Sequence, residues 1–313
     1  MDAIYLDQAY FAAVQCAQTV QRSFDAFSRL VSKLQTEDIT VYVPGSGYDL
    51  ETNSGLQLWQ ILYERQHEFG LTTADVTNVS WLLERCHRYP NQVSEDFTVH
   101  ANGVPTTSAS YGMAYDSNLA EVAGIGLDQR HPNGLYSISS PRGRPKSAYF
   151  LTDESHAVEL YRHFLVNNLD DNNLFERFFG RAFPSLLPAA ALDPRNLGVD
   201  LAGKSEMIVK HLSYLNDSYI SCGEECGWDL PRMQRHASAA GVDLSDESSN
   251  TKQDRKKMRE REVKWVVDGL EKTIECGMHT KVEPTRGRIH FSVENRGAGR
   301  VIVVGLMCEH LST

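Results

Sequence analysis

The sequence predicts an α+β fold, with a mostly helical α/β body at the N-terminus and a small C-terminal domain of one helix and an antiparallel β-hairpin or small sheet. Two observations predict it. Helical spacing and short β-branched runs alternate through most of the chain, whereas residues 252–313 change in both pattern and charge. At 313 residues the chain also exceeds a typical single domain, so we expect at least two domains.

Residues 1–150 are expected to form the α/β body. Apolar side chains recur at helical spacing from residue 6 to residue 35, which predicts a helix. The alternating run Ile39–Val43 then ends at Pro44-Gly45, which indicates a strand followed by a turn. The other elements expected in the body are helices at 56–68 and 74–88 and strands at 97–100, 135–139 and 147–151.

Residues 151–243 are expected to form a helical region packed on the body. Thr152 or Asp153 can cap its first helix, because a short side-chain oxygen accepts hydrogen bonds from the free amides of the first turn. The polar, turn-rich stretch 241–251 is the expected boundary with the C-terminal domain. The helices expected in this region cover residues 153–165, 172–180 and 204–219.

The C-terminal domain is expected to span residues 252–313. Apolar side chains at helical spacing predict a helix over residues 253–274. The runs Arg288–Phe291 and Val301–Val304 alternate with a period of two and predict a hairpin. Arg288 and His290 then share one face, and the apolar residues beside them point to the opposite face, which the predicted helix would cover.

Charge is distributed unevenly along the chain. The net charge is -10, but residues 252–313 hold 13 Lys and Arg against 9 Asp and Glu, a balance of +4, which leaves -14 for residues 1–251. A basic segment attached to an acidic body has two interpretations: a solvated helix face, or an electrostatic footprint for RNA or another polyanion. The residues expected to contact nucleic acid are Arg255, Lys256, Lys257, Arg259, Arg286 and Arg300.

Several enzyme classes lack their signatures in this sequence. There is no Gly-rich phosphate loop of the Walker type, no Rossmann fingerprint after a strand and no His-Glu-x-x-His, which argues against ATP hydrolysis, dehydrogenation and zinc-dependent proteolysis. The close pair Cys222 and Cys226 is not followed by a second Cys/His pair at finger spacing, so we expect reduced thiols. We expect no cofactor.

The candidate catalytic residues lie around the C-terminal hairpin. Histidines can move protons near neutral pH, and lysine and arginine can hold a phosphodiester. A metal site remains an alternative, but the histidines and the nearby Cys276 and Cys308 are too widely spaced to give a usable signature. In a third interpretation the histidines only form hydrogen bonds within a packed sheet. The candidates are His279, Lys281, Arg288, His290 and His310.

The same segment resembles a known family. A helix followed by His-x-Lys, then Arg-Ile-x-Phe, a turn and a Val/Ile-rich strand resembles the core of RelE-type ribosome-dependent mRNA interferases, toxins of toxin–antitoxin pairs, and their ParE-like relatives. The resemblance covers residues 252–313 and implies a small α+β sheet that cleaves mRNA. It implies that Lys281 and Arg288 stabilise the phosphate, that His279 or His290 acts as base or acid, and that His310 stands where the family has a basic or aromatic residue.

The sequence therefore leads to a functional hypothesis and a rival. The hypothesis is a cytoplasmic toxin-like or anti-phage effector whose metal-independent, RNA-cleaving C-terminal domain is restrained by the acidic body. Its partners would be RNA, on or off the ribosome, and an antitoxin or defence-system protein. The rival is a non-enzymatic accessory protein whose basic tail docks on nucleic acid or on a protein. No apolar run reaches membrane-spanning length, and the start of the chain is acidic, so no membrane association is expected.

Overall fold

The structure is a computed structural model of the whole chain. It describes residues 3–89, 98–101, 104–107, 110, 133–140, 143–190, 192–267, 269–297 and 299–312. The chain divides into two compact units, Met1–Leu160 (unit 1) and Tyr161–Thr313 (unit 2). The division lies inside a helix, α4 (Ala157–Asn167). Helices and several sheets occur together, so the predicted α+β class is confirmed.

Unit 1 begins with a parallel three-stranded sheet in the order β1-β2-β3. Two helices accompany it in the chain, and the side chain of Thr72 caps the second by accepting a hydrogen bond from the amide of Asp75. The expected helix over 6–35 begins later than predicted, and the one over 56–68 is reduced to a short π-helical turn. The elements are β1 (Ala3–Tyr5), α1 (Ala17–Thr36), β2 (Thr40–Pro44), η1 (Gln60–Glu64), α2 (Thr73–Glu84) and β3 (His87–Tyr89).

A second sheet of unit 1 is antiparallel, with strand order β5-β4-β6-β7. Three of its strands match the strands expected at 97–100, 135–139 and 147–151 to within a few residues, although residue 97 itself lies outside the described part. A 3-10 turn then leads into α4, and the Asp153 side chain caps this turn by accepting from the amide of Ser155. The elements are β4 (Thr98–Ala101), β5 (Val104–Thr107), β6 (Gly134–Ser140), β7 (Gly143–Phe150) and η2 (Glu154–His156).

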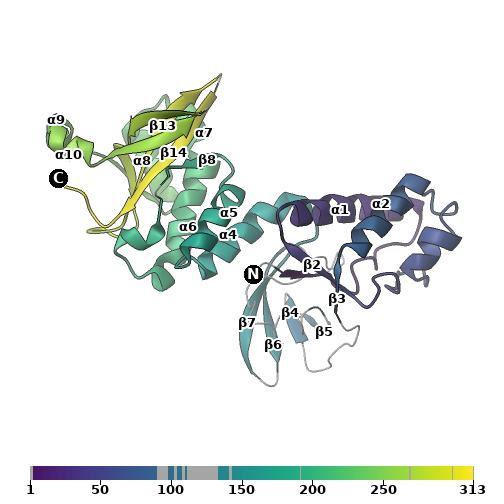
Figure 1. Cartoon of the computed structure of the whole chain (residues 1–313). Helices are drawn as coiled ribbons and strands as arrows, with labels where there is room; N and C mark the ends of the chain where they lie inside the picture. Colours follow the sequence, from purple (N-terminus) through teal and green to yellow (C-terminus); the bar gives the residue numbers. More distant parts are fainter. Residues whose placement is uncertain are drawn as a thin grey trace. The chain divides into compact units, whose positions relative to one another are not determined.

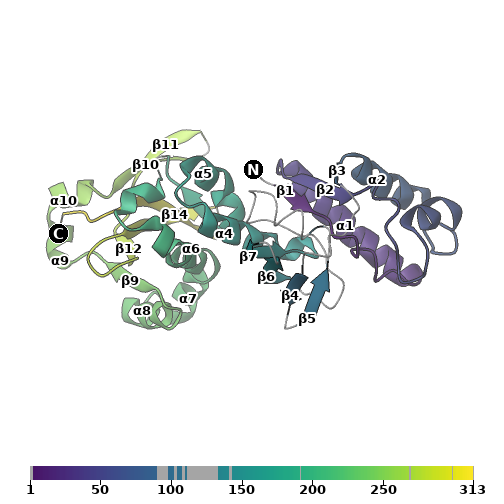
Figure 2. The same cartoon turned by 90° about the horizontal axis from the view of Figure 1, so that it is seen from below.

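Unit 2 is built on a five-stranded sheet in the order β8-β14-β13-β12-β9. The outer strand β8 runs parallel to β14, and the other neighbours are antiparallel. Helices α5 and α6 lie next to this sheet in both views (Figure 1, Figure 2). The strands are β8 (Leu186–Pro188), β9 (Asp243–Asp246), β12 (Met278–Lys281), β13 (Arg288–Arg296) and β14 (Gly299–Cys308).

The helices of unit 2 largely follow the expected pattern. Asp171 caps α5 by accepting from two amides of its first turn, and α6 covers the segment predicted as helix over 204–219 up to Asp217. The helices and turns are α5 (Asn172–Ala182), η3 (Pro194–Leu197), α6 (Leu201–Asp217), α7 (Tyr219–Cys226), α8 (Leu230–Ala239), α9 (Ser249–Gln253) and α10 (Arg255–Arg259).

The long helix predicted over residues 253–274 is wrong beyond residue 259. After α10 the chain forms a hairpin of β10 (Glu262–Val267) and β11 (Leu270–Glu275) instead. The sequence contains the reason: Val263 and Trp265 are buried while Lys264 and Val266 are exposed, which is the period of a strand. A Gly269 with φ of 78° follows, as a tight turn between strands requires.

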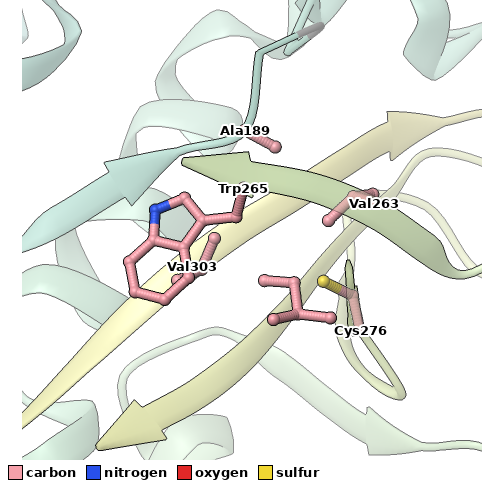
Figure 3. Close-up of a cluster of buried hydrophobic side chains, with 6 residues drawn as sticks. Ala189, Val263, Trp265, Cys276 and Val303 are labelled. Atoms are coloured by element: carbon pink, nitrogen blue, oxygen red, sulfur yellow. The ribbon is translucent and has the colours of Figure 1, made fainter. Parts of the chain in front are cut away.

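This hairpin packs on the five-stranded sheet through a buried apolar cluster. Figure 3 shows Val263 and Trp265 of the hairpin with Cys276 and, from β14, Val303. Ala189 and Ile274 complete the buried set, and Leu187, Val301 and Leu306 pack around it. An isolated two-stranded hairpin is marginally stable in water, so this cluster is what holds β10 and β11 in place.

The sheet does not begin at the predicted domain boundary. Strands β8 and β9 precede residue 252 and pair with strands that follow it, so residues 252–313 are not a separate domain, and the boundary expected at 241–251 lies inside unit 2. The helices of residues 161–243 belong to this same unit. Within the described residues, no helix combines the length and the apolar character needed to cross a membrane.

Candidate functional site

The residues of interest lie in register across three neighbouring strands. His279 of β12 is paired with His290 of β13 on one side and with Ser245 of β9 on the other. Lys281 is paired in the same way with Arg288. Paired residues of neighbouring strands point to the same face, so all of these side chains lie on one face of the sheet, which we call the histidine face.

The opposite face packs on helices. Phe291 of β13 is fully buried, and its ring makes an edge contact with Tyr219 of α7, with the ring centroids 4.9 Å apart. Ile289 and Thr280 are also completely buried on this face. The alternation predicted for Arg288–Phe291 is therefore confirmed, but helices before residue 252 provide the cover that was expected from residues 253–274.

The two histidines are buried side by side. His279 is 7% and His290 1% exposed, and their ring centroids are 4.9 Å apart. Burial lowers the pKa of His279 to about 4, and the cations of Arg288 and Lys281 act in the same direction. Burial and the neighbouring His279 lower the pKa of His290 to about 3. Both imidazoles are thus neutral at physiological pH.

A buried ion pair lies beside the histidines. Glu247, which follows β9, accepts a hydrogen bond from Nε of Arg261 at 2.7 Å, and their side chains are 5% and 1% exposed. Arg261 also donates to the carbonyl oxygens of Lys257 and Ser312, at 2.7 and 3.0 Å. The carboxylate of Glu247 lies 3.6 Å from Nδ1 of His279. A buried charge needs such partners, because an unpaired one is costly.

The two predicted phosphate-holding cations differ in what their side chains contact. Arg288 donates from its two terminal nitrogens to backbone carbonyls of the loop after β12, including those of Glu283 and Pro284 at 2.7 and 2.8 Å. Its guanidinium therefore fixes that loop. Lys281 is 29% exposed at the side chain and lies 3.7 Å from a carboxylate oxygen of Asp243. Lys281 is the more available of the two for a ligand.

A pocket of about 280 Å³ opens over the histidine face. The exposed His310, which follows β14, lies at its edge. All five residues predicted as catalytic line this one pocket, although they are spread over more than 30 positions of the sequence. The lining residues are Ser245, Asp246, Glu247, Ser248, Thr251, Arg261, His279, Lys281, Arg288, His290, His310 and Leu311.

The residues predicted to bind nucleic acid do not gather at the pocket. Those of α10 form a short run in which Arg255, Lys256 and Arg259 are exposed. Arg286 is exposed and forms an ion pair with Glu283 at 2.8 Å. Arg300 stacks on Trp228, 3.9 Å from the ring centroid, and lines a different pocket of about 530 Å³.

The buried ion pair of the pocket was missed by the sequence argument. Glu247 lies in the polar stretch 241–251, which was interpreted as a boundary although it contains a strand of the sheet. Arg261 was counted among the charges of an expected helix, but it lies in the turn after α10 and is buried. The signal that could have found them is the alternation of Val242, Leu244 and their polar neighbours before Glu247.

The six cysteines form no disulfide in the structure. Cys222 and Cys226, one turn apart on α7, have their sulfur atoms 4.0 Å apart without a bond. Comparison with known proteins adds no family to this picture: no protein-family model, curated protein or solved structure matches the chain. The functional argument therefore rests on the pocket and its chemistry.

Proposed function

We propose that unit 2 is a metal-independent ribonuclease of the toxin or anti-phage effector type and that the pocket over the histidine face is its active site. The observation that carries the proposal is the meeting of all five predicted catalytic side chains in one pocket. The resemblance to RelE-type interferases gives less support, because a hairpin stands before His279 where the resemblance implied a helix.

The chemistry divides among the pocket residues according to burial and charge. We assign the base role to His279 because its ring is unprotonated at neutral pH, although a pKa of about 4 makes it a weak base for the proton of a ribose 2'-hydroxyl. The ammonium of Lys281 can stabilise the charge that develops on the phosphorane. His310 is exposed at the edge, where it can bring a proton to the 5' leaving oxygen. His290 carries too low a pKa to serve as that acid.

Arg288 takes a different role from the one first expected. Its two terminal nitrogens hold backbone carbonyls of the loop 283–287, so we assign it to positioning that loop and, through its charge, to the positive field of the pocket. Arg261 contributes to the same field and fixes Glu247 beside His279. Unit 1 would restrain or target the nuclease, with an antitoxin or defence-system protein as partner.

The test is growth of a bacterial host after induction of the full chain, with total RNA examined alongside. The informative variant is Lys281→Met/His310→Gln, because neither side chain is fully buried and both replacements should leave the fold intact. Lys264→Met is the matched control, since Lys264 is 63% exposed on β10 and lies outside the pocket. We expect growth arrest and RNA loss with wild type and control, and normal growth with the double variant.

Harmless expression of the wild type, or equal arrest with the double variant, would remove the support for an active site in this pocket. Loss of toxicity in the Lys264→Met control would point to general charge effects instead. Protein levels and thermal unfolding of each variant must be compared, so that a folding defect is not mistaken for a lost activity.

A second function is favoured by one observation: much of the pocket's polar network is internally satisfied. The buried Arg261–Glu247 pair and the carbonyl contacts of Arg288 are what a non-catalytic protein would need to hold its sheet together. The exposed cations of α10 would then be the docking surface. In that case neutralising Arg255, Lys256 and Arg259 one by one would weaken RNA binding in graded, salt-dependent steps, without any cleavage.

A further inference from the structure

We propose that Glu247, His279 and His290 also form a binding site for a divalent transition-metal ion of the zinc type, and that the bound ion switches the pocket off. The second half of this statement rests on the proposed function, whereas the first half does not. The ion would take the nitrogen lone pair that the proposed cleavage uses.

The donor set is the first argument. Two imidazoles and one carboxylate are the ligand types that zinc and its neighbours in the first transition series prefer. One ligand atom from each of the three residues lies within 4.8 Å of the others. The donors of a tetrahedral zinc site are separated by about 3.3 Å, which follows from bonds of about 2.0 Å. Oε1 of Glu247 lies 3.6 Å from Nδ1 of His279 and 4.0 Å from Nδ1 of His290, so side-chain rotations, the largest at His290 to present Nε2, would close the site.

The sheet places these donors without help from a ligand. His279 and His290 face each other on adjacent strands, and Ser245 continues the same row on β9. Glu247 is two residues beyond Ser245, so the alternation of the chain directs it to the same face. The site is thus set by strand register rather than by the spacing of residues in the sequence, which is why the spacing suggested no metal.

The hydrogen bonds of the histidines leave one nitrogen of each available. Nδ1 of His290 lies 3.1 Å from the carbonyl oxygen of Cys276, to which it donates, so the lone pair is on Nε2. This Nε2 and Nδ1 of His279 are both buried and have no hydrogen-bond partner among the described residues. A histidine that donates one N–H to a backbone carbonyl and keeps the other nitrogen unpartnered is typical of a metal ligand.

The carboxylate is held in the way that ligating carboxylates usually are. Arg261 donates to Oε1 of Glu247, and Arg261 itself is fixed by the carbonyls of Lys257 and Ser312. Its positive charge weakens the attraction for a cation, so we expect a moderate affinity, suited to reversible occupation. The pocket of about 280 Å³ leaves space for a water molecule as a further ligand.

The binding experiment uses the purified full chain after treatment with a chelator. Co²⁺ is added while visible absorption is recorded, and Zn²⁺ is then used to displace it. We expect one ion per chain and at least a tenfold weaker affinity in Glu247→Gln and in His279→Gln. His310 lines the same pocket but is not one of the three proposed ligands. The metal affinity of His310→Gln should therefore equal that of wild type.

A measurement on the wild type keeps the proposal testable if a variant fails to fold. Nitrogen chemical shifts of the imidazoles should move on Zn²⁺ addition at Nδ1 of His279 and Nε2 of His290. Shifts confined to other histidines, or an ion that binds Glu247→Gln as tightly as wild type, would overturn the site.

The consequence for activity is measured separately. If RNA is cleaved by the chelator-treated protein, one equivalent of Zn²⁺ should reduce the rate at least tenfold, and chelator should restore it. Zn²⁺ that binds without slowing cleavage would overturn the switch but not the site. Zn²⁺ binding in a protein without any cleavage would overturn the proposed ribonuclease and leave the metal site standing. Cleavage that requires the ion would overturn the switch and the metal-independent mechanism together.

Discussion

The two faces of the five-stranded sheet in unit 2 are made by the same strands but carry different kinds of side chain. One face packs on helices through Ile289, Phe291 and their neighbours. The other carries two histidines, an arginine and a lysine at one end, and at the other end Val301, Val303 and Leu306, which pack against the β10–β11 hairpin. Residues on both faces are buried to a similar degree. Folding alone would favour apolar groups in both places, because buried polar groups need partners. The buried polar end of the histidine face is therefore where stability depends on paired charges and hydrogen bonds rather than on apolar packing.

Among the variants on the two faces, we expect the largest loss of stability when the buried ion pair is broken. Arg261→Met leaves the Glu247 carboxylate buried without its partner, so we expect the free energy of unfolding to fall by about 3–5 kcal/mol. Arg259→Met, an exposed change on α10, should cost less than about 0.5 kcal/mol. Urea unfolding of both variants measures this.

A second substitution in the same ion pair tests whether the loss of stability comes from the unpaired charge. Because the cost of Arg261→Met comes from an unpaired charge, the double variant Glu247→Leu/Arg261→Met should recover most of it. An apolar deletion on the helix-packed face, such as Phe291→Ala, leaves a cavity and has no such rescue. If the double variant were as unstable as the single one, Arg261 would act through packing rather than charge.

The next effect is a loss of stability in acid that comes from the histidine face. His279 has a pKa of about 4 in the folded state, and an unfolded histidine titrates near about 6.5. Between these values the unfolded chain binds the proton, so stability is complete above about pH 6.5 and falls as the pH drops toward 4. The difference corresponds to about 3 kcal/mol for this group alone.

Unfolding measured from pH 7 to pH 4 checks this, with His279→Gln expected to show a shallower decline. His163 and His211 also have pKa values lowered to about 4 by burial, so part of the slope remains. His87→Gln, a change of an exposed histidine, is the control and should follow wild type. An unchanged slope in His279→Gln would mean that this imidazole is not held neutral in the folded protein.

The smallest expected effect is a gain in stability, from a substitution on the helix-packed face. The hydroxyl of Thr280 is completely buried and has no hydrogen-bond partner within the described part of the chain. Thr280→Val should therefore stabilise the protein, by about 1 kcal/mol. The exposed Thr273→Val should change stability by less than about 0.5 kcal/mol. A destabilised Thr280→Val would show that the hydroxyl has a partner, such as an ordered water.

The sequence predicted correctly which side chains of the hairpin share a face, because the alternation along a strand depends only on neighbouring residues. Arg288, His290 and Phe291 lie on the faces expected of them. It failed for residues 262–275, where Val267, Leu270 and Ile274 are three and four positions apart, as on one face of a helix. The choice between helix and strand was made by packing against Val303, a contact that the local sequence does not contain.

The pocket was predicted in part for the same reason. The histidines and Lys281 could be chosen by residue type, but Glu247 and Arg261 could not, since they reach the site through the pairing of β9 with β12 and through the turn after α10. The domain boundary was misplaced because the strand β9 is short and lies among polar residues. Long-range pairing, rather than local propensity, completes both the sheet and the site.

The measurement that tests the central claim most directly is cleavage of a defined RNA by the purified full chain in the presence of EDTA. The same sequence with 2'-O-methyl riboses serves as the matched substrate, because it lacks the hydroxyl that His279 would deprotonate. We predict cleavage of the RNA alone, with 2',3'-cyclic phosphate ends, and a loss of at least a hundredfold in Lys281→Met/His310→Gln. Cleavage of both substrates, or an undiminished rate in the double variant, would contradict the assignment of this pocket.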